Sequence, residues 1–382
     1  MQEIPFNRPY LVGSETRYIE QAVEEGWLSA GGSFTDRCEH WLAERTGAHR
    51  ALLTHSCTSA LEAAALIAGL GPGDEVIMPS FTFVSTAAAF VLCGATPVFV
   101  DIEPETLNLD PDQVEAAVTQ ATRAIVPVHY AGVACRIDAL EAIADRHDLL
   151  LIEDAAHSLM STYRGRPLGA IGSFGALSFH ETKNVTCGEG GALLVNDPAL
   201  VAQAEIVWDK GTNRRQFERG EVDRYSWVAL GSSLGTGAVT AAFLWAQLER
   251  AEEITADRMR SWRRYHESLA RLEDDGLLRR PIVPAECGHN AHMYYVLLPE
   301  AAARPDFLAE MRRRGILAVF HYVPLHSSRA GSTLGRAAGE LPQTESLSAR
   351  VVRLPLWAGM PESDCDRVIA SVHEALGAAV PG

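Results

Sequence analysis

The chain has 382 residues, of which 47% are hydrophobic and 21% are charged, and its formal net charge is -16. This composition is typical of a globular protein with one large and one smaller domain, and the acidic excess argues against a nucleic-acid-binding surface. No apolar run approaches the roughly 20 residues that span a bilayer, and no signal peptide is recognisable, so we expect a cytoplasmic protein without membrane contact.

Hydrophobic periodicity predicts two amphipathic helices within residues 1–50, separated by LSAGGSFTD, where Ser33 or Thr35 could cap the second helix. From residue 51 onward, short apolar runs alternate with helical patterns, from ALLTHSCTSALEAAALIAGL to the strand in LLLIEDAAHS. Continuously apolar strands separated by helices indicate a mostly parallel sheet covered on both faces. Two further strands, in GALSFH and GGALLVN, flank Lys183.

A long helical run begins near residue 237 with GAVTAAFLWAQLERAEEITADRMRSWRRYHESLARL, and a chain can leave a large domain along such a helix. The strands in AHMYYVLLP and GILAVFHYVPLH and the helix in SDCDRVIASVHEALGAA indicate a smaller α+β domain. The predicted fold class is therefore α/β, with a large domain over residues 1–245 and a small C-terminal domain over residues 246–382.

The segment THSCTSALEAA places small hydroxylated residues between a strand and a helix. Free amides at a helix N-terminus bind anions and hydroxyl groups add donors, so Cys57, Thr58 and Ser59 could form a phosphate cradle. Serine and threonine are also the commonest helix caps, and this segment taken alone favours an ordinary cap.

Asp154 lies at the carboxyl end of a predicted buried strand, which is the edge where open α/β sheets bind ligands. A carboxylate there can pair with a cationic ring nitrogen or cap the next turn, while Glu153 points to the other face of the strand. His157 could cover a cofactor or form a hydrogen bond within its own loop.

Lys183 follows Asp154 in SFHETKNVTCGEGG, and a desolvated lysine beside a phosphate can form a Schiff base with a carbonyl group. Ser178 could reach the same phosphate. In PSFTFVST, either Phe81 or Phe83 could stack on a planar cofactor, although core packing is the commoner role of phenylalanine. The order of phosphate turn, aromatic ring, aspartate and S-x-x-x-x-K is that of a pyridoxal phosphate enzyme, in which the aspartate keeps the ring nitrogen protonated.

The sequence resembles the DegT/DnrJ/EryC1/StrS sugar aminotransferase family, in the fold-type I group of pyridoxal phosphate enzymes, and within it the dTDP-4-amino-4,6-dideoxygalactose transaminases. The resemblance runs from IPFNRP through PGDEVIMPSFTFVSTA, AIVPVHYAGVAC, IEDAAHS and SFHETKNVTCGEGGALLVND to FHYVPLH. It implies pyridoxal 5'-phosphate (PLP) as cofactor, with pyridoxamine phosphate (PMP) as its aminated form. It also implies that Lys183 and Asp154 are catalytic: Lys183 binds the cofactor covalently and moves a proton, and Asp154 pairs with the ring nitrogen.

The resemblance assigns further residues to the cofactor and the substrate. Its cofactor-binding set is Thr58, Ser59, Phe83, Asp154, His157, Ser178, Lys183 and Ser233. Its substrate-binding set is Lys210, Tyr322 and His326, which would contact the sugar nucleotide. Ser233 stands where many relatives carry an asparagine that reaches the partner subunit's phosphate, and a serine there could donate one hydrogen bond. A homodimer with active sites at the interface is implied.

The implied reaction moves the amino group of L-glutamate to C4 of a dTDP-4-keto-6-deoxy-hexose and yields 2-oxoglutarate. A 3-keto sugar aminotransferase, or either a gluco or a galacto product, stays open because no motif orients the sugar. A sugar dehydrase of the same family would carry histidine in place of Lys183. A non-catalytic protein would not need Lys183 together with Asp154, and a nicotinamide-dependent enzyme would need G-x-G-x-x-G after its first strand. The seven scattered cysteines form no C-x-x-C pair, so neither a disulfide framework nor a metal site is expected.

Overall fold

The structure is a computed structural model and describes residues 3–377. Its centre is an eight-stranded sheet with the strand order β1-β9-β8-β5-β4-β2-β3-β13. The strands are β1 (Arg50–Thr54), β2 (Glu75–Pro79), β3 (Thr96–Val100), β4 (Thr122–Ile125), β5 (Leu150–Asp154), β8 (Phe174–Ser178), β9 (Gly191–Val195) and β13 (Arg336–Ala337). Neighbouring strands of this sheet run parallel except at β9, which is antiparallel to β1 and β8. The prediction of a mostly parallel sheet is confirmed.

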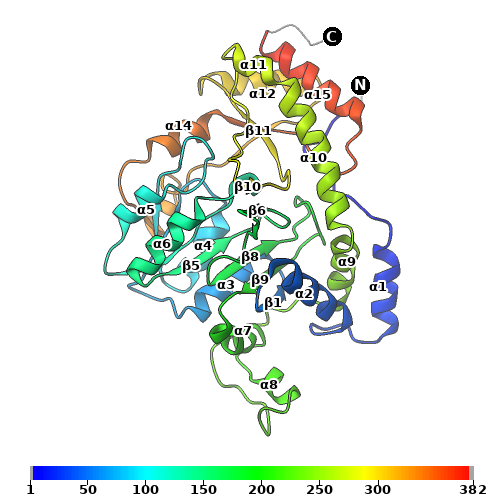
Figure 1. Cartoon of the computed structure of the whole chain (residues 1–382), viewed down its shortest axis with the longest axis vertical. Helices are drawn as coiled ribbons and strands as arrows, with labels where there is room; N and C mark the ends of the chain where they lie inside the picture. Colours follow the sequence, from blue (N-terminus) through cyan, green and yellow to red (C-terminus); the bar gives the residue numbers. More distant parts are fainter. Residues whose placement is uncertain (1–2, 378–382) are drawn as a thin grey trace.

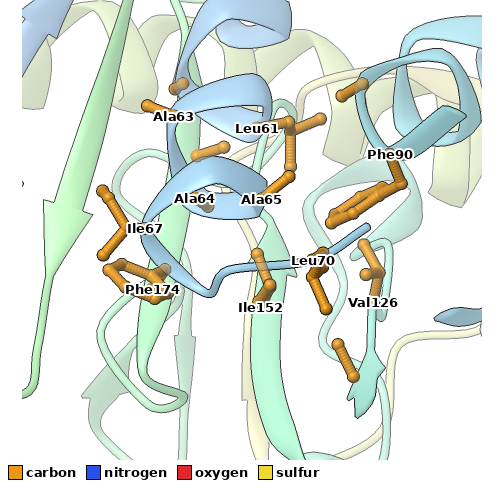
Figure 2. Packing of buried hydrophobic residues seen from close by; sticks show 14 of the residues in the cluster. Leu61, Ala63, Ala64, Ala65, Ile67, Leu70, Phe90, Val126, Ile152 and Phe174 are labelled. Carbon is orange, nitrogen blue, oxygen red and sulfur yellow. The ribbon is translucent and has the colours of Figure 1, made fainter. Parts of the chain in front are cut away.

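Helices cover both faces of this sheet, because its strands are apolar on both sides. One face packs against α3 (Cys57–Ile67), α4 (Val84–Leu92) and α7 (Val201–Trp208). Figure 2 shows α3 lying against Ile152 of β5 and Phe174 of β8. The other face packs against α2 (Ser33–Thr46), α9 (Ala238–Leu248), α5 (Pro111–Ala117) and α6 (Ile137–His147).

The C-terminal part forms a second core around a small antiparallel sheet, above the large sheet in Figure 1. The strand order of this sheet is β11 (Tyr294–Leu297), β14 (Val351–Leu354) and β12 (Val319–Phe320). The helices of this second core are α10 (Ala251–Ser268), α12 (Ala303–Arg313) and α15 (Glu362–Ala375). Phe81 and Tyr130, which follow β2 and β4, pack with Tyr295 of β11 and Val351 of β14. The small sheet therefore covers the carboxyl edge of the large sheet.

Two local predictions were wrong. The long helical run is three helices, α9, α10 and α11 (Ala270–Asp274), because the chain turns at residues 249–250 from the large sheet toward the small one. The N-cap of α2 is Gly32, with Ser33 as the first helical residue, so neither Ser33 nor Thr35 caps it. The hydroxyl of Ser33 donates to the Glu25 carboxylate instead.

The remaining elements are short or peripheral. They are α1 (Glu15–Glu24), η1 (Tyr130–Gly132), β6 (Thr162–Tyr163), β7 (Arg166–Pro167), η2 (Pro198–Leu200), α8 (Arg214–Glu218), β10 (Cys287–Gly288), α13 (Gly331–Leu334) and α14 (Pro342–Arg350). The predicted boundary between residues 245 and 246 falls inside α9 and stays a prediction. Within residues 3–377, no helix combines the length and apolar character needed to cross a bilayer.

Candidate active site

A cavity of about 620 Å³ lies where the carboxyl edge of the large sheet meets the small sheet. The N-terminus of α3, the segments that follow β2, β5 and β8, and residues of β12 and β14 line it. Ligands of open α/β sheets bind at this edge. The cavity brings together the following sequence-predicted residues: Thr58, Phe83, Asp154, His157, Ser178, Lys183 and Tyr322.

Lys183 lies in the loop between β8 and β9, and its side chain is half-buried in the cavity. Its ammonium group has no hydrogen-bond or ion-pair partner among the residues that the structure describes. Burial lowers the pKa of Lys183 to about 8, opposed by Cys57 and Asp154 and assisted by the charge of Arg353. A desolvated amine with a lowered pKa is a nucleophile and a base at moderate pH.

Asp154, at the end of β5, is buried and accepts two hydrogen bonds. Its Oδ2 accepts from the Thr86 hydroxyl at 2.7 Å, and its Oδ1 accepts from the Ala156 amide at 3.1 Å. Thr82 lies 2.8 Å from the Thr86 hydroxyl and continues the chain of hydroxyls. Burial raises the pKa of Asp154, against the opposing effects of the Thr86 bond, the Ala156 amide and the Lys183 charge. These bonds hold the carboxylate in one orientation at the cavity wall.

The helix α3 presents its N-terminus to the cavity. Its N-cap is Ser56, whose Oγ accepts from the Ser59 amide at 3.1 Å, and the Thr58 hydroxyl donates to Ser85 at 2.8 Å. A Cβ on Gly191 would lie 2.3 Å from the backbone carbon of Ser56, so this glycine allows the helix to begin directly against β9. Free amides at such a terminus attract anions, as does a nearby hydroxyl.

His157 stacks on His292, with ring centroids 4.3 Å apart and planes 19° apart. Burial lowers the pKa of His157 well below its usual value, and the charges of Lys183 and Arg353 lower it further, so the imidazole is neutral. Its Nδ1 atom is buried and has no hydrogen-bond partner within residues 3–377. Because buried polar atoms are nearly always paired, this nitrogen is suited to a ligand in the cavity.

These groups fit a flat ring that carries a phosphate, a basic nitrogen and an aldehyde. The N-terminus of α3 matches the phosphate, and the fixed carboxylate of Asp154 matches a protonated ring nitrogen. The unpartnered amine of Lys183 and the unpartnered Nδ1 of His157 match the aldehyde and a further polar substituent. Phe83 lies at the cavity wall with 57% of its surface exposed, where a ligand ring could cover it.

Four predicted residues do not line this cavity: Ser59, Lys210, Ser233 and His326. The Nζ of Lys210 lies 2.7 Å from Asp209, and Ser233 forms an isolated bridge with the same residue in an exposed segment. The His326 ring lies 2.7 Å from Ser80 and 3.4 Å from Glu345. The roles of these four residues stay predictions.

Sequence reasoning missed several polar residues of the cavity, namely Thr86, Arg258, His292, His321 and Arg353. A signal for Arg353 was present, since it is the one charge in the otherwise apolar sequence VVRLPLW. Charged residues are rarely placed in buried strands unless they are paired or functional. The other residues lie in patterns that ordinary helix or loop positions explain equally well.

Glu153 faces away from the cavity, as predicted from strand alternation. Its buried carboxylate lies 2.9 Å from His129 and accepts from the amides of Gly169, Ile171 and Gly172 at 2.7–2.8 Å. Burial raises the pKa of Glu153, but the His129 bond and the amide bonds outweigh it and leave the pKa below its ordinary value.

Replacing Glu153 with alanine is expected to lower the free energy of unfolding by about 3–5 kcal/mol, because it leaves buried donors unpaired. Urea denaturation measures this change. The matched control is Glu141→Ala, which removes a surface ion pair with Arg166 and should cost less than about 1 kcal/mol. Equal losses in the two variants would contradict the structural role of Glu153.

Comparisons of the sequence and the structure with known proteins identify the same family. The model of the DegT/DnrJ/EryC1/StrS aminotransferase family matches residues 9–373. The chain is similar to the GDP-perosamine synthase of Caulobacter vibrioides, at 36% identity over 372 residues, covering 96% of this chain and 97% of that protein.

Two solved structures are also similar. One is DesI in the presence of its TDP-sugar product, with a TM-score of 0.88 and 32% identity, covering 98% of this chain and 93% of that one. The other is the PLP form of Spr1654 from Streptococcus pneumoniae, with a TM-score of 0.89 and 26% identity, covering 98% of this chain and 99% of that one.

Proposed function

Because this chain belongs to the DegT/DnrJ/EryC1/StrS aminotransferase family, whose members are PLP-dependent sugar aminotransferases, we propose that it aminates C4 of a nucleotide-linked 4-keto-6-deoxy-hexose with L-glutamate as donor. The observation that carries this proposal is the unpartnered Lys183 amine, in one cavity with the fixed carboxylate of Asp154. The amino sugar and 2-oxoglutarate are the products.

The nucleotide has two candidates. The overall sequence pattern and the TDP-sugar product named with DesI favour dTDP. The name of the Caulobacter relative favours GDP, and that relative has the higher identity, at 36% against 32%. The sugar occupies the same cavity in either case, so the choice concerns the end of the substrate that lies away from Lys183.

Different residues of the cavity would bind different parts of PLP. The amides at the start of α3, with the hydroxyls of Thr58 and Ser178 in the cavity lining, would bind its phosphate. Phe83 would stack on the ring, and His157 would form a hydrogen bond with a ring substituent. The bound cofactor supplies an electron sink for the carbanion that forms at the substrate carbon.

Lys183 and Asp154 would carry the proton chemistry. The carboxylate of Asp154 would hold a proton on the ring nitrogen, and its bonds to Thr86 and Ala156 fix the orientation of the carboxylate. The free amine of Lys183 would take the proton from Cα of the amino donor and would return it when the amino group is left on the cofactor. In the second half-reaction, Lys183 moves a proton in the opposite direction and places it on C4 of the sugar.

The proposal includes a cytoplasmic homodimer. Apolar side chains with more than half of their surface exposed lie at the cavity mouth, namely Phe83 and the adjacent Val84, and in the segment after α8, namely Tyr225, Trp227 and Leu230. Helix α8 projects from the body of the molecule in Figure 1. Exposed apolar groups of this kind mark protein contacts. In a dimer, Lys210 and Ser233 of one subunit could reach the cavity of the other. Sedimentation equilibrium tests the assembly.

A spectroscopic test separates the substrate candidates. L-Glutamate should convert the wild-type protein from the PLP form to the PMP form. The PMP form is then mixed with dTDP-4-keto-6-deoxyglucose, GDP-4-keto-6-deoxymannose or a 3-keto sugar nucleotide. We expect the absorbance spectrum of the PLP form to reappear when a 4-keto sugar nucleotide is added. The preferred nucleotide is the one with which this spectrum reappears fastest. A return with the 3-keto sugar alone would overturn C4 as the site of amination.

The pKa of Lys183 predicts how the apoprotein captures its cofactor. Only the neutral amine attacks an aldehyde, and burial lowers the pKa of Lys183 to about 8 from its ordinary 10.5. The rate of covalent PLP capture should therefore rise with pH around a midpoint of about 8. Stopped-flow absorbance between about pH 6 and pH 10 measures it. A midpoint near the ordinary value of 10.5 would show that the amine is solvated.

A further inference from the structure

Arg353 lines the cavity and has no counter-ion in the part of the chain that the structure describes. It lies in β14, and its Nη2 donates to the Phe320 carbonyl at a long 3.4 Å, while its buried Nε has no hydrogen-bond partner within residues 3–377. Among the described residues, no carboxylate forms an ion pair with it. An arginine offers several N–H donors, and leaving them unpaired in a desolvated site is costly. The site is therefore suited to an anionic ligand.

The guanidinium group of Arg353 is held in place before any ligand arrives. It lies over the Phe6 ring, 4.6 Å from the ring centroid. Phe6 belongs to the N-terminal segment, which is anchored by pairing of Ile4 with Ile316 and by a hydrogen bond from Asn7 to the Glu181 carbonyl at 3.2 Å. Stacking keeps the planar donor fork in one orientation, which favours bidentate binding of a carboxylate.

The other arginine of the cavity does not compete for this role. Arg258, on α10, donates through Nε to the Ala291 carbonyl at 3.0 Å and through Nη2 to the His292 carbonyl at 2.6 Å. Its donors are thus used to hold the segment that carries His292 against His157. Arg353 is left as the arginine of the cavity whose donors are mostly free.

The place of Arg353 in the cavity also indicates which anion it meets. Arg353 lines the same cavity as Lys183 and His157, and its charge also lowers the pKa of both groups. The α-carboxylate of an amino acid is bonded directly to the carbon whose proton Lys183 would move. The diphosphate of a sugar nucleotide is instead separated from C4 by the hexose ring.

We propose that Arg353 binds a carboxylate of the amino donor and so positions the donor carbon beside Lys183. This inference rests on the proposed function, because the donor is taken to be L-glutamate. It predicts that the two half-reactions depend on Arg353 unequally, since the amino sugar carries no carboxylate. Arg353 would then be the residue that selects an amino acid as the first substrate.

The test compares the wild-type PLP form with Arg353→Met, Arg353→Lys and the control Arg350→Met. Arg350 donates to the Pro299 carbonyl at 3.1 Å and does not line the cavity. Two half-saturation concentrations are measured by absorbance, one for L-glutamate and one for the amino-sugar product in the reverse direction. The dissociation constant of glutarate, a dicarboxylate that cannot react, is measured by calorimetry.

Arg353→Met should raise the half-saturation concentration of L-glutamate and the dissociation constant of glutarate by about 100-fold. Arg353→Lys should raise both by about 10-fold, because lysine keeps the positive charge but cannot form the paired hydrogen bonds of a guanidinium group. The half-saturation concentration of the amino sugar should change by less than about threefold in both Arg353 variants. Arg350→Met should leave all three measured values unchanged. Thermal unfolding and the visible spectrum of the bound cofactor show whether each variant is folded.

Other outcomes overturn the inference. Unchanged glutarate binding in Arg353→Met would exclude a carboxylate site, as would a wild-type protein that does not bind glutarate. If L-glutamate and the amino sugar bind equally less tightly, Arg353 has a merely structural role. If only the amino sugar binds less tightly, Arg353 binds the diphosphate. Because glutarate binding needs no turnover, it tests Arg353 even if the proposed sugar acceptor is wrong.

Discussion

Replacing Lys183 with methionine is expected to reduce amino transfer by about 10⁴-fold or more, because one amine would serve as both nucleophile and proton carrier. Methionine keeps the length and apolar stem of the side chain, so the cavity should retain its shape. No other amine can substitute: the chain has two lysines, and Lys210 lies outside the cavity, beside Asp209. Steady-state turnover with L-glutamate and the preferred sugar nucleotide measures the loss.

Borohydride reduction identifies the amine directly. With two lysines in the chain, peptide mass mapping needs to separate only the Lys183 peptide from the Lys210 peptide. We expect the reduced adduct at Lys183 in the wild-type protein and in Lys210→Met, and no adduct in Lys183→Met. An adduct at Lys210, or amino transfer that survives in Lys183→Met, would exclude the mechanism.

Replacing Asp154 with asparagine is expected to lower turnover by about 10³-fold, because a neutral amide cannot hold the proton on the ring nitrogen against burial. The substitution conserves shape, and the donors from Thr86 and Ala156 remain in place. Turnover and the dissociation constant of PLP are measured together. A turnover within about tenfold of the wild type would mean that Asp154 only caps its turn.

Two further readouts separate the charge of Asp154 from its position. Asp154 raises the pKa of Lys183, so Asp154→Asn should move the midpoint of PLP capture below about 8. Thr86→Val removes a hydrogen bond and leaves the charge, so it should cost about tenfold in turnover, whereas Thr86→Ser should restore most of it. Equal behaviour of Thr86→Val and Thr86→Ser would show that the bond does not position the carboxylate.

The main sheet and part of the site could be predicted from the sequence because they depend on local patterns. Apolar runs alternate with helices, and this pattern by itself predicts parallel strands buried on both faces. The carboxyl ends of parallel strands share one edge, and Asp154 at the end of β5 and Ser178 at the end of β8 both lie there, in the cavity lining. Lys183 follows the second of these strands, and Thr58 lies at a helix start facing the same edge.

The sequence by itself thus determined the fold class and the sheet edge at which Lys183 and Asp154 share a cavity, since periodicity and strand ends are local properties. Tertiary structure alone decided which distant side chains complete the cavity. Thr86 reaches Asp154, His292 stacks on His157, and Arg353 enters from the small sheet. His326 forms bonds with Ser80 and Glu345 outside the cavity lining. These outcomes depend on packing between segments far apart in the chain, where one residue's partner is set by how two cores meet rather than by its neighbours in sequence.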